Sequence, residues 1–259
     1  MLPTQWLLLN VPTVLLGFIV VGISILLALL TSFFTTFIIP ESKSRGYNGV
    51  AFMLFGGTTL IYAILLTTIL FTSWIGFNEA DQNVQKEANC LVSLYRFAEA
   101  FPSATKQSIQ NLLDEYTKSI VYKEWSYLAR SQLDKHTTVI SKQLWSTYSS
   151  YVPQTPPEQA YQQESLHQLI ELRRCRMQRL TDSKAGVNPI LWLVLIIGEM
   201  TTVASIAFFS DNLKSRLLMA VIFAILIGLI FFTILMFDYP FTGQFIISSE
   251  PIKEALLYW

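Results

Sequence analysis

The residues from Val14 to Ile39 have the sequence VLLGFIVVGISILLALLTSFFTTFII. This run holds no charged side chain, and the first charge of the whole chain is Glu41. About 20 helical residues cross the roughly 30 Å hydrocarbon core of a bilayer, so the run is long enough to span it with some tilt. No Lys or Arg precedes it, whereas a secretory signal peptide has a positive n-region and a shorter apolar run. We therefore interpret it as a retained first membrane helix.

Three further apolar runs have the same character. After a short turn at 40–46, a second run covers residues 50–77. The third begins at Pro189, where the start of a helix tolerates proline, and covers 189–209. The fourth follows a tight polar connection and covers 216–237. The sequence predicts an all-α integral membrane protein with four transmembrane helices, arranged as two hairpins.

Charge is distributed unevenly along the chain. Of the 36 charged residues, 25 lie between Glu79 and Lys184, in a segment of 106 residues. That segment is about 24% charged, close to the roughly 25% of an ordinary soluble domain. The other 153 residues carry 11 charges, about 7%, which is too few for a surface that meets water on all sides. We therefore expect an extramembrane domain between spans two and three.

The charged middle has the spacing of amphipathic helices. We expect one helix over about 84–98, ended by Pro102, and a second that starts with Ser103 as its N-cap and extends to Leu128. Two more are expected over about 135–151 and 158–182, and the first and last helices should continue spans two and three. The predicted parts are a first transmembrane hairpin, a helical extramembrane domain, a second transmembrane hairpin and a C-terminal tail, at 1–78, 79–188, 189–237 and 238–259.

Basic residues near the span ends indicate the orientation. Four spans place both termini and the helical domain on one side of the membrane. Seven Lys or Arg residues lie near the span ends on that side and four lie opposite, which favours a cytoplasmic domain in a multi-pass protein of the cell membrane. The seven are Lys86, Arg173, Arg174, Arg176, Arg179, Lys184 and Lys253, and the four are Lys43, Arg45, Lys214 and Arg216.

Composition excludes several classes of function. A net charge of zero and a pI near 6.7 give no basic field for nucleic-acid binding. Cys90 and Cys175 lack the spacing of a metal or redox motif, so reduced, helix-packing thiols are the favoured interpretation and a disulfide between them is the alternative. His136 and His167 have no partner at metal-ligand spacing. Without a phosphate loop, nucleophile elbow or ligand cluster, we expect neither an enzyme nor a bound cofactor.

Glu199 is the most informative single residue. It lies at the middle of the third span, and no other charged residue lies within ten positions of it. An ionisable group at membrane depth indicates a functional site by default. Two interpretations stay open: a proton-titrating or ion-pathway residue, or a neutral link between helices that hydrogen-bonds to hydroxyls on this or a neighbouring helix, such as Thr201, Thr202 or Ser205.

Four arginines precede the third span: Arg173, Arg174, Arg176 and Arg179. They point in several directions around one helix. One interpretation is anchoring to lipid headgroups together with pairing to acids on neighbouring helices. The other is an electropositive mouth that concentrates anions in front of a pore.

Two patterns concern packing rather than chemistry. Small residues recur at every fourth position on two spans, which lets helix backbones approach closely; they are Ser24, Ala28 and Ser32 on the first and Ala220, Ala224 and Gly228 on the last. After the fourth span, the residues at 238–243 form an abrupt, turn-rich exit. We expect this tail to fold back on the helical domain, with Asp238 accepting N–H bonds from the turn.

The tail also carries a family resemblance. Asp238, Pro240, Phe241 and Gly243, followed by Glu250 and Pro251, resemble the D-x-P-F-x-G and S-x-E-P tail of the bestrophin homologue family. Further matching positions follow through the chain: Glu87-Ala88, Leu94-Tyr95-Arg96, Tyr116, Glu124-Trp125, Arg173, residues 176–180, Pro189 and Leu191-Trp192. The resemblance implies a four-span protein with a helical domain between spans two and three. The Arg-Phe-Pro-Thr signature and an acidic calcium clasp are absent, so it implies neither pore residues nor calcium gating.

Bestrophins proper are pentameric anion channels, and the resemblance implies a similar homo-oligomer that passes small anions through the bilayer. We expect bulky residues of the second span at the constriction, among them Phe52, Phe55 or Tyr62. Two alternatives stay open. One is a proton- or ion-coupled transporter that uses Glu199, and the other is a non-transporting scaffold or assembly subunit of a membrane complex.

Overall fold

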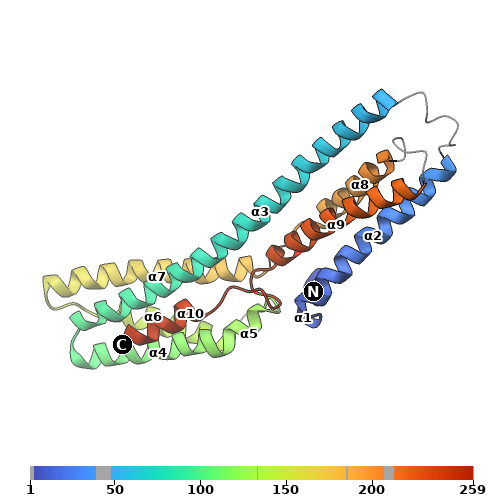
Figure 1. Ribbon diagram of the computed structural model, residues 1–259. Helices are drawn as coiled ribbons and strands as arrows, with labels where there is room; N and C mark the ends of the chain where they lie inside the picture. Colours follow the sequence, from blue (N-terminus) through green and yellow to red (C-terminus); the bar gives the residue numbers. More distant parts are fainter. Residues whose placement is uncertain (1–2, 39–47, 133, 185, 207–212, 259) are drawn as a thin grey trace. The chain divides into compact units, whose positions relative to one another are not determined.

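The computed structural model of the chain describes residues 3–38, 48–132, 134–184, 186–206 and 213–258. Within those ranges every regular element is helical (Figure 1). The helices are α1 Pro3–Asn10, α2 Thr13–Ile38, α3 Asn48–Phe97, α4 Ser103–Ser119, α5 Trp125–Leu128, α6 Lys135–Ser150, α7 Pro156–Asp182, α8 Pro189–Ile206, α9 Leu213–Asp238 and α10 Glu250–Ala255. Short helical turns lie at η2 Ala98–Ala100, η3 Ile120–Glu124 and η4 Leu256–Tyr258.

Four of these helices are long and apolar enough to cross a membrane: α2, α3, α8 and α9. The predicted four-span, all-α fold is therefore confirmed. The turn predicted at 40–46 and the end of the third span at Phe209 lie outside the described residues. The chain divides into two compact units, which we call the membrane unit, residues 2–75 and 186–238, and the helical unit, residues 76–185 and 239–259.

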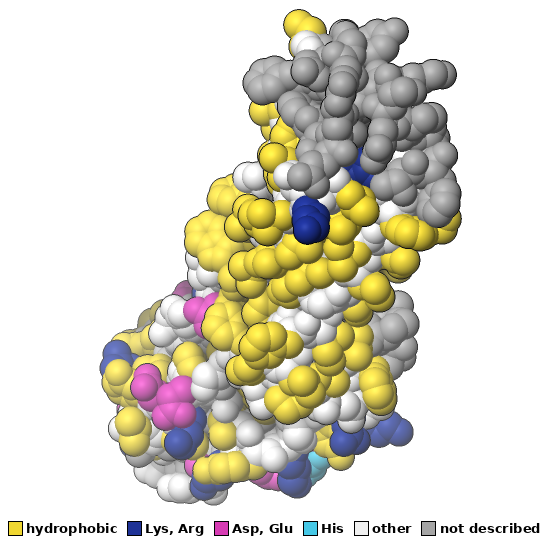
Figure 2. All heavy atoms as spheres, turned by 45° about the vertical axis from the view of Figure 1, so that its right-hand side comes forward, with side chains coloured by type: hydrophobic (Ala, Val, Ile, Leu, Met, Phe, Trp, Pro, Cys, Tyr) yellow, Lys and Arg dark blue, Asp and Glu magenta, His cyan; other side chains and the backbone are white. Residues whose placement is uncertain are grey.

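In the membrane unit, α2 packs against α8 and α9, and the two stripes of small residues meet in the α2–α9 contact. Ala28 shares a buried cluster with Ala220 and Ala224. A Cβ atom on Gly228 would lie only 2.9 Å from Val21 Cα, so glycine is what permits this approach. The outward faces keep large apolar side chains exposed, and Figure 2 shows a broad hydrophobic surface with the acidic side chains gathered elsewhere.

The second span and the first domain helix form one continuous helix. With 50 residues at about 1.5 Å each, α3 is about 75 Å long and confirms that the first domain helix continues span two. The equivalent prediction for the last domain helix is wrong, because α7 ends at Asp182 and α8 begins at Pro189. Proline has no N–H and disfavours helical backbone before it, and the Asn188 side chain accepts the Ile190 N–H at 2.9 Å to cap the new start.

In the helical unit, α4 and α5 are joined by the π-helical turn η3, so they form one helix with an irregular turn inside it. The prediction that Ser103 caps α4 is wrong by one residue: Pro102 occupies the cap position and Ser103 is already helical. Phe241, Ile247 and Ile252 belong to the same buried core as α4, α6 and α7. The expected folding of the tail onto the helical domain is therefore confirmed.

Candidate functional site

Glu199 lies inside the membrane unit, fully buried on α8. Its neighbour is Ser24 of α2, whose hydroxyl contacts Glu199 Oε1 and also Ala224 O of α9, the latter at 3.0 Å. The second carboxyl oxygen, Oε2, has no hydrogen-bond partner among the described residues. Glu199 therefore joins α8 to α2 and α9 through one serine hydroxyl.

Glu199 contacts a hydroxyl on a neighbouring helix, as predicted, but it is that of Ser24 and not one of the three named in advance. Thr201, Thr202 and Ser205 donate to carbonyl oxygens of α8 itself, at 2.6–2.9 Å, so they satisfy their own helix. Ser24 had been noted only as a small residue of the packing stripe. Nothing in the sequence around Ser24 marks it as the partner of an acid on another span.

The hydrogen bonds around Ser24 suit a neutral carboxyl group. A serine hydroxyl carries one proton and can donate to Glu199 or to Ala224 O, but not to both at once. If Glu199 carries a proton, it donates to Ser24 Oγ and Ser24 donates to Ala224 O, so each donor has an acceptor. An ionised Glu199 would leave Oε2 buried and unbonded, and no basic side chain is paired with it in the described part of the chain.

The three aromatic residues predicted for the pore take different positions. Tyr62 is only 5% exposed, and its hydroxyl donates to Leu195 O of α8 at 2.8 Å. A side chain that lines a channel between subunits must be accessible on the single chain, so Tyr62 does not fit that role. Phe55 is half-buried and packs edge-on against Phe223 of α9, with ring centroids 5.8 Å apart. The Phe52 side chain lies outside the described residues.

A different face of α3 carries exposed polar groups. Thr67, Thr68 and Thr72 are exposed beside Phe71 and line a shallow groove of about 400 Å³ with Ala63 and Ile64. Thr68 and Thr72 donate to the carbonyl oxygens of Ile64 and Thr68, each at 2.8 Å. On α9 the exposed large side chains are apolar, namely Leu213, Leu218, Met219, Ile222, Ile225, Leu226 and Leu229. The hydroxyl groups of the groove, which we call the threonine face, distinguish α3 from α9.

The helical unit contains a buried network of two arginines and two glutamates. Arg179 donates to Glu87 through Nε at 2.7 Å and through Nη2 at 3.1 Å, and Nη2 also reaches Glu124 Oε1 at 2.8 Å. Arg176 donates to Glu124 through Nε at 3.1 Å and through Nη2. Three of the four side chains are fully buried and Arg176 is 6% exposed. The Arg179 guanidinium lies over the ring of Trp125, with its central carbon 5.1 Å from the ring centroid.

The network keeps Arg179 charged, although at Glu87 burial outweighs the arginines and raises the pKa of the carboxyl group. Burial acts to lower the pKa of Arg179, but Glu87 and Glu124 outweigh it, so this pKa lies above its ordinary value. Glu124 is the last residue of the π-helical turn η3, and such turns are frequent at functional sites. Two positive and two negative groups balance one another within contact distance. The network therefore ties α3 and α7 to the α4–α5 helix without presenting net charge.

The four arginines of α7 thus separate into two pairs. Arg176 and Arg179 are buried among carboxylates, so only the pairing interpretation fits them. Arg173 and Arg174 are exposed, and Arg174 donates to Glu171 on the same helix at 3.0 Å. A mouth that attracts anions stays a prediction for Arg173 and Arg174.

The tail motif shapes the turn that follows α9. Asp238 accepts a hydrogen bond from the Val187 N–H before α8, so the expected bond from the following turn is wrong. Pro240 O accepts the Ile247 N–H at 2.9 Å, and Phe241 is buried with its ring edge-on to Trp125 at 5.7 Å. Gly243 has φ of 105°, a backbone conformation that other residues rarely adopt.

The end of the motif starts a short helix. Glu250 is the first residue of α10 and Pro251 the second, where a missing N–H needs no partner. The Ser248 hydroxyl accepts the Glu250 N–H at 3.1 Å. Trp125 Nε1 donates to Ile247 O at 3.3 Å, so the same tryptophan contacts the tail and the buried network.

Comparison with known proteins agrees with this architecture. Residues 22–252 match the profile of the Bestrophin-like domain. A bacterial bestrophin homologue from Klebsiella pneumoniae has a similar structure, with a TM-score of 0.66, 14% identity, and coverage of 91% of this chain and 96% of that one. A membrane protein solved with one substitution is similar too, with a TM-score of 0.67, 14% identity and coverage of 92% and 97%.

No curated protein matches the sequence. The structural likeness at 14% identity supports the fold alone. The profile match covers most of the chain, and the residues of the tail motif lie inside it. This chain is a member of the Bestrophin-like family.

Proposed function

We propose that the chain is a subunit of a homo-oligomeric channel, pentameric by analogy with bestrophins, that conducts small anions across the cell membrane. The threonine face of α3 is the observation that carries this proposal, because it places exposed hydroxyl groups at membrane depth. Thr68 and Thr72 can rotate their O–H from the helix carbonyls toward a passing ion. Lipid requires no such groups, whereas a pore wall needs polar atoms that replace part of the hydration shell of an ion. A ring of subunits with α3 facing its axis places these hydroxyls around a common pathway.

Charge on the helical unit supports the choice of anions. Arg173 and Arg174 are exposed on α7, where they raise the local anion concentration. Arg176 and Arg179 do not attract anions to this surface, because Glu87 and Glu124 neutralise them inside the buried network. We place the helical unit and both termini on the cytoplasmic side, as the distribution of basic residues predicts.

The first prediction tests both conduction and the pore wall. Cys90 and Cys175 are replaced with serine, and Thr68→Cys is added to this background. We expect chloride flux from proteoliposomes that falls at least tenfold when a charged methanethiosulfonate reagent modifies Cys at position 68, because a fixed bulky charge obstructs a narrow pathway. The measurement is chloride efflux before and after treatment with the reagent.

The matched control is Ile222→Cys in the same background, since Ile222 is 51% exposed on the apolar face of α9. Its flux should not change on treatment. Flux of sodium without flux of chloride would support a channel but contradict the proposed anion selectivity. Equal inhibition at both positions, or no ion flux at all, would contradict the pore assignment.

The geometry of Glu199 favours a second candidate, proton-coupled transport. The single hydroxyl proton of Ser24 can be donated either to Glu199 or to Ala224 O. Protonation of Glu199 therefore changes the hydrogen bonds that connect α2, α8 and α9. Tyr62 of α3 is a titratable side chain that interacts electrostatically with it, and Ser24 and Ala224 bring no charge from α2 and α9. Arg216 of α9 donates to Ser32 O at 3.0 Å instead.

Glu199→Gln tests this candidate, because the amide keeps the shape of the side chain and cannot titrate. If Glu199 carries the proton, the variant should lose the pH dependence of ion flux between pH 5 and 8 while it retains flux. Met200→Gln is the control, since it places the same amide on the exposed side of α8. A pH profile of Glu199→Gln that matches the wild type would remove proton coupling and leave Glu199 as a neutral link.

A further inference from the structure

The two cysteines lie side by side because of how α3 and α7 pair. Asn83 Nδ2 donates to Asp182 Oδ2 at 3.3 Å, and Arg179 bonds Glu87 one turn further along. The residue number increases along α3 while that of the bonded partner on α7 decreases, so the two helices are antiparallel at this contact. The next turn of this ladder brings Cys90 of α3 beside Cys175 of α7, where each thiol shifts the pKa of the other. Both thiols are free and buried.

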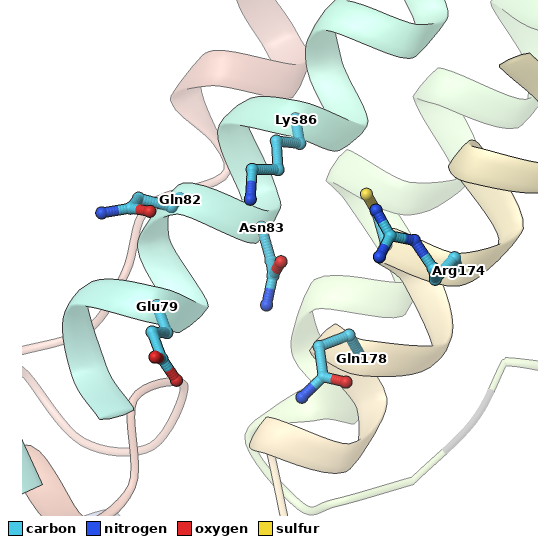
Figure 3. A pocket seen from close by; sticks show the side chains of 7 residues that line it. Glu79, Gln82, Asn83, Lys86, Arg174 and Gln178 are labelled. Carbon is cyan, nitrogen blue, oxygen red and sulfur yellow. The ribbon is translucent and has the colours of Figure 1, made fainter. Parts of the chain in front are cut away.

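An open groove leads to this thiol pair. It has a volume of about 340 Å³, and Cys175 forms part of its lining. Figure 3 shows that Glu79, Gln82, Asn83 and Lys86 lie on the α3 side and Arg174 and Gln178 on the α7 side, all in the helical unit. The lining thus holds two basic side chains and one acidic one. Lys86 is exposed and has no ion-pair partner in the described part of the chain, so its charge is available to a ligand.

Cys175 is the more reactive of the two thiols. The adjacent Cys90 thiol lowers the pKa of Cys175, and this outweighs burial and the Glu87 charge, which raise it; the Arg174 charge adds a smaller lowering. The thiolate is the nucleophile in thiol chemistry, and basic neighbours favour it. A small disulfide with carboxylate groups complements Lys86 and Arg174, and the amides of Asn83 and Gln178 offer further hydrogen bonds.

We propose that Cys175 and Cys90 form a thiol–disulfide exchange site that accepts small anionic disulfides through this groove. The Cys175 thiolate attacks one sulfur of the small disulfide, whose S–S bond breaks as a mixed disulfide forms. One small thiolate leaves and takes up a proton. Cys90 then loses its proton and attacks Cys175 Sγ, which forms the Cys90–Cys175 disulfide and releases the second small thiol. Two protein thiols are oxidised and one small disulfide is reduced to two thiols.

The product would cross-link α3 to α7 one turn from the Glu87–Arg179 pair. α3 is the helix that continues without a break into the second span. In a reducing cytoplasm the two thiols stay free. A rise in the concentration of small disulfides converts them to the Cys90–Cys175 disulfide, as is typical of redox-sensing pairs. The site therefore gives the helical unit a covalent response to oxidation.

The experiment uses reduced, full-length protein in detergent, with oxidised glutathione as the anionic probe and cystamine as the cationic one. Thiol alkylation and intact mass follow the reaction. We expect wild-type protein to lose both alkylatable thiols and to end without a bound probe. Cys90→Ser should stop at a mixed disulfide on Cys175, whereas Cys175→Ser should react at least tenfold more slowly. Two thiols that stay alkylatable with both probes, or a fast Cys175→Ser variant, would overturn the proposal.

Lys86→Gln tests the role of the groove separately from folding. It should slow the reaction with oxidised glutathione about two- to fivefold, the effect of one exposed charge, and should not slow cystamine. Lys142→Gln is the matched control, since Lys142 is an exposed lysine of α6 outside this groove. Equal slowing of both probes by Lys86→Gln would overturn the anionic preference.

Discussion

Arg179→Met is expected to lower the free energy of unfolding by about 3–5 kcal/mol, because it leaves a buried charge without its partner. Glu87 loses both of its bonds from Arg179, at 2.7 and 3.1 Å, and keeps no other cation within hydrogen-bond distance in the described part of the chain. Glu124 retains Arg176. The measurement is denaturant unfolding in detergent followed by tryptophan fluorescence, since Trp125 lies 5.1 Å from the guanidinium.

Arg174→Met is the control, with the same substitution on the same helix. Arg174 is exposed, and among the described residues its one ion pair is with Glu171, so the expected change is within about 0.5 kcal/mol. Adding Glu87→Gln to Arg179→Met removes the orphaned charge and should recover part of the loss. If Arg179→Met and Arg174→Met unfold at the same denaturant concentration, the network does not stabilise the fold.

The four spans could be predicted because bilayer thickness sets a length and hydrocarbon excludes charge. A run such as residues 14–39 satisfies both conditions without any knowledge of its neighbours. The extramembrane domain could be predicted from charge as well, because its charge density is that of a soluble domain and the density of the apolar runs is much lower. These properties are local in sequence, so one sequence suffices to read them.

Helix boundaries and partners depend on contacts between distant residues, and there the predictions were less successful. α7 was expected to continue into the third span, but Pro189 and the Asn188 cap start a new helix. Ser24 and Glu199 are 175 residues apart, and nothing local in either sequence indicates their contact. The stripe of small residues around Ser24 predicted close packing, and it was confirmed without revealing the polar contact inside it.

The spacing of residues on α7 indicates that two of its arginines are buried, although this spacing was not used to predict it. Leu169, Leu172, Arg176 and Arg179 follow one another at spacings of three and four, so both arginines share the buried face of α7 with leucines. Arg173 and Arg174 fall between these positions and face outward. A charge on the apolar face of a helix requires a buried partner, but the identity of Glu87 and Glu124 depends on the tertiary fold.

Gly228→Ala is expected to destabilise the membrane unit by about 1–3 kcal/mol, the usual range for an extra methyl group in a well-packed contact. The added Cβ would lie 2.9 Å from Val21 Cα, which belongs to the backbone of α2, and 3.2 Å from Ser24 Cβ. A backbone atom cannot turn aside as a flexible side chain can, so α2 and α9 must separate. The measurement is the unfolding midpoint in detergent.

Gly22→Ala is the matched control on the other helix of the pair. A Cβ at Gly22 meets no atom within 4 Å, and alanine favours helix over glycine, so this variant should be neutral or slightly stabilised. The difference between the two variants isolates packing from helix propensity. The separation forced at Gly228 also moves Ser24 away from Glu199, so adding Glu199→Gln to Gly228→Ala should cost less than the sum of the two single effects. Strict additivity would show that the α2–α9 contact and the buried acid are energetically independent.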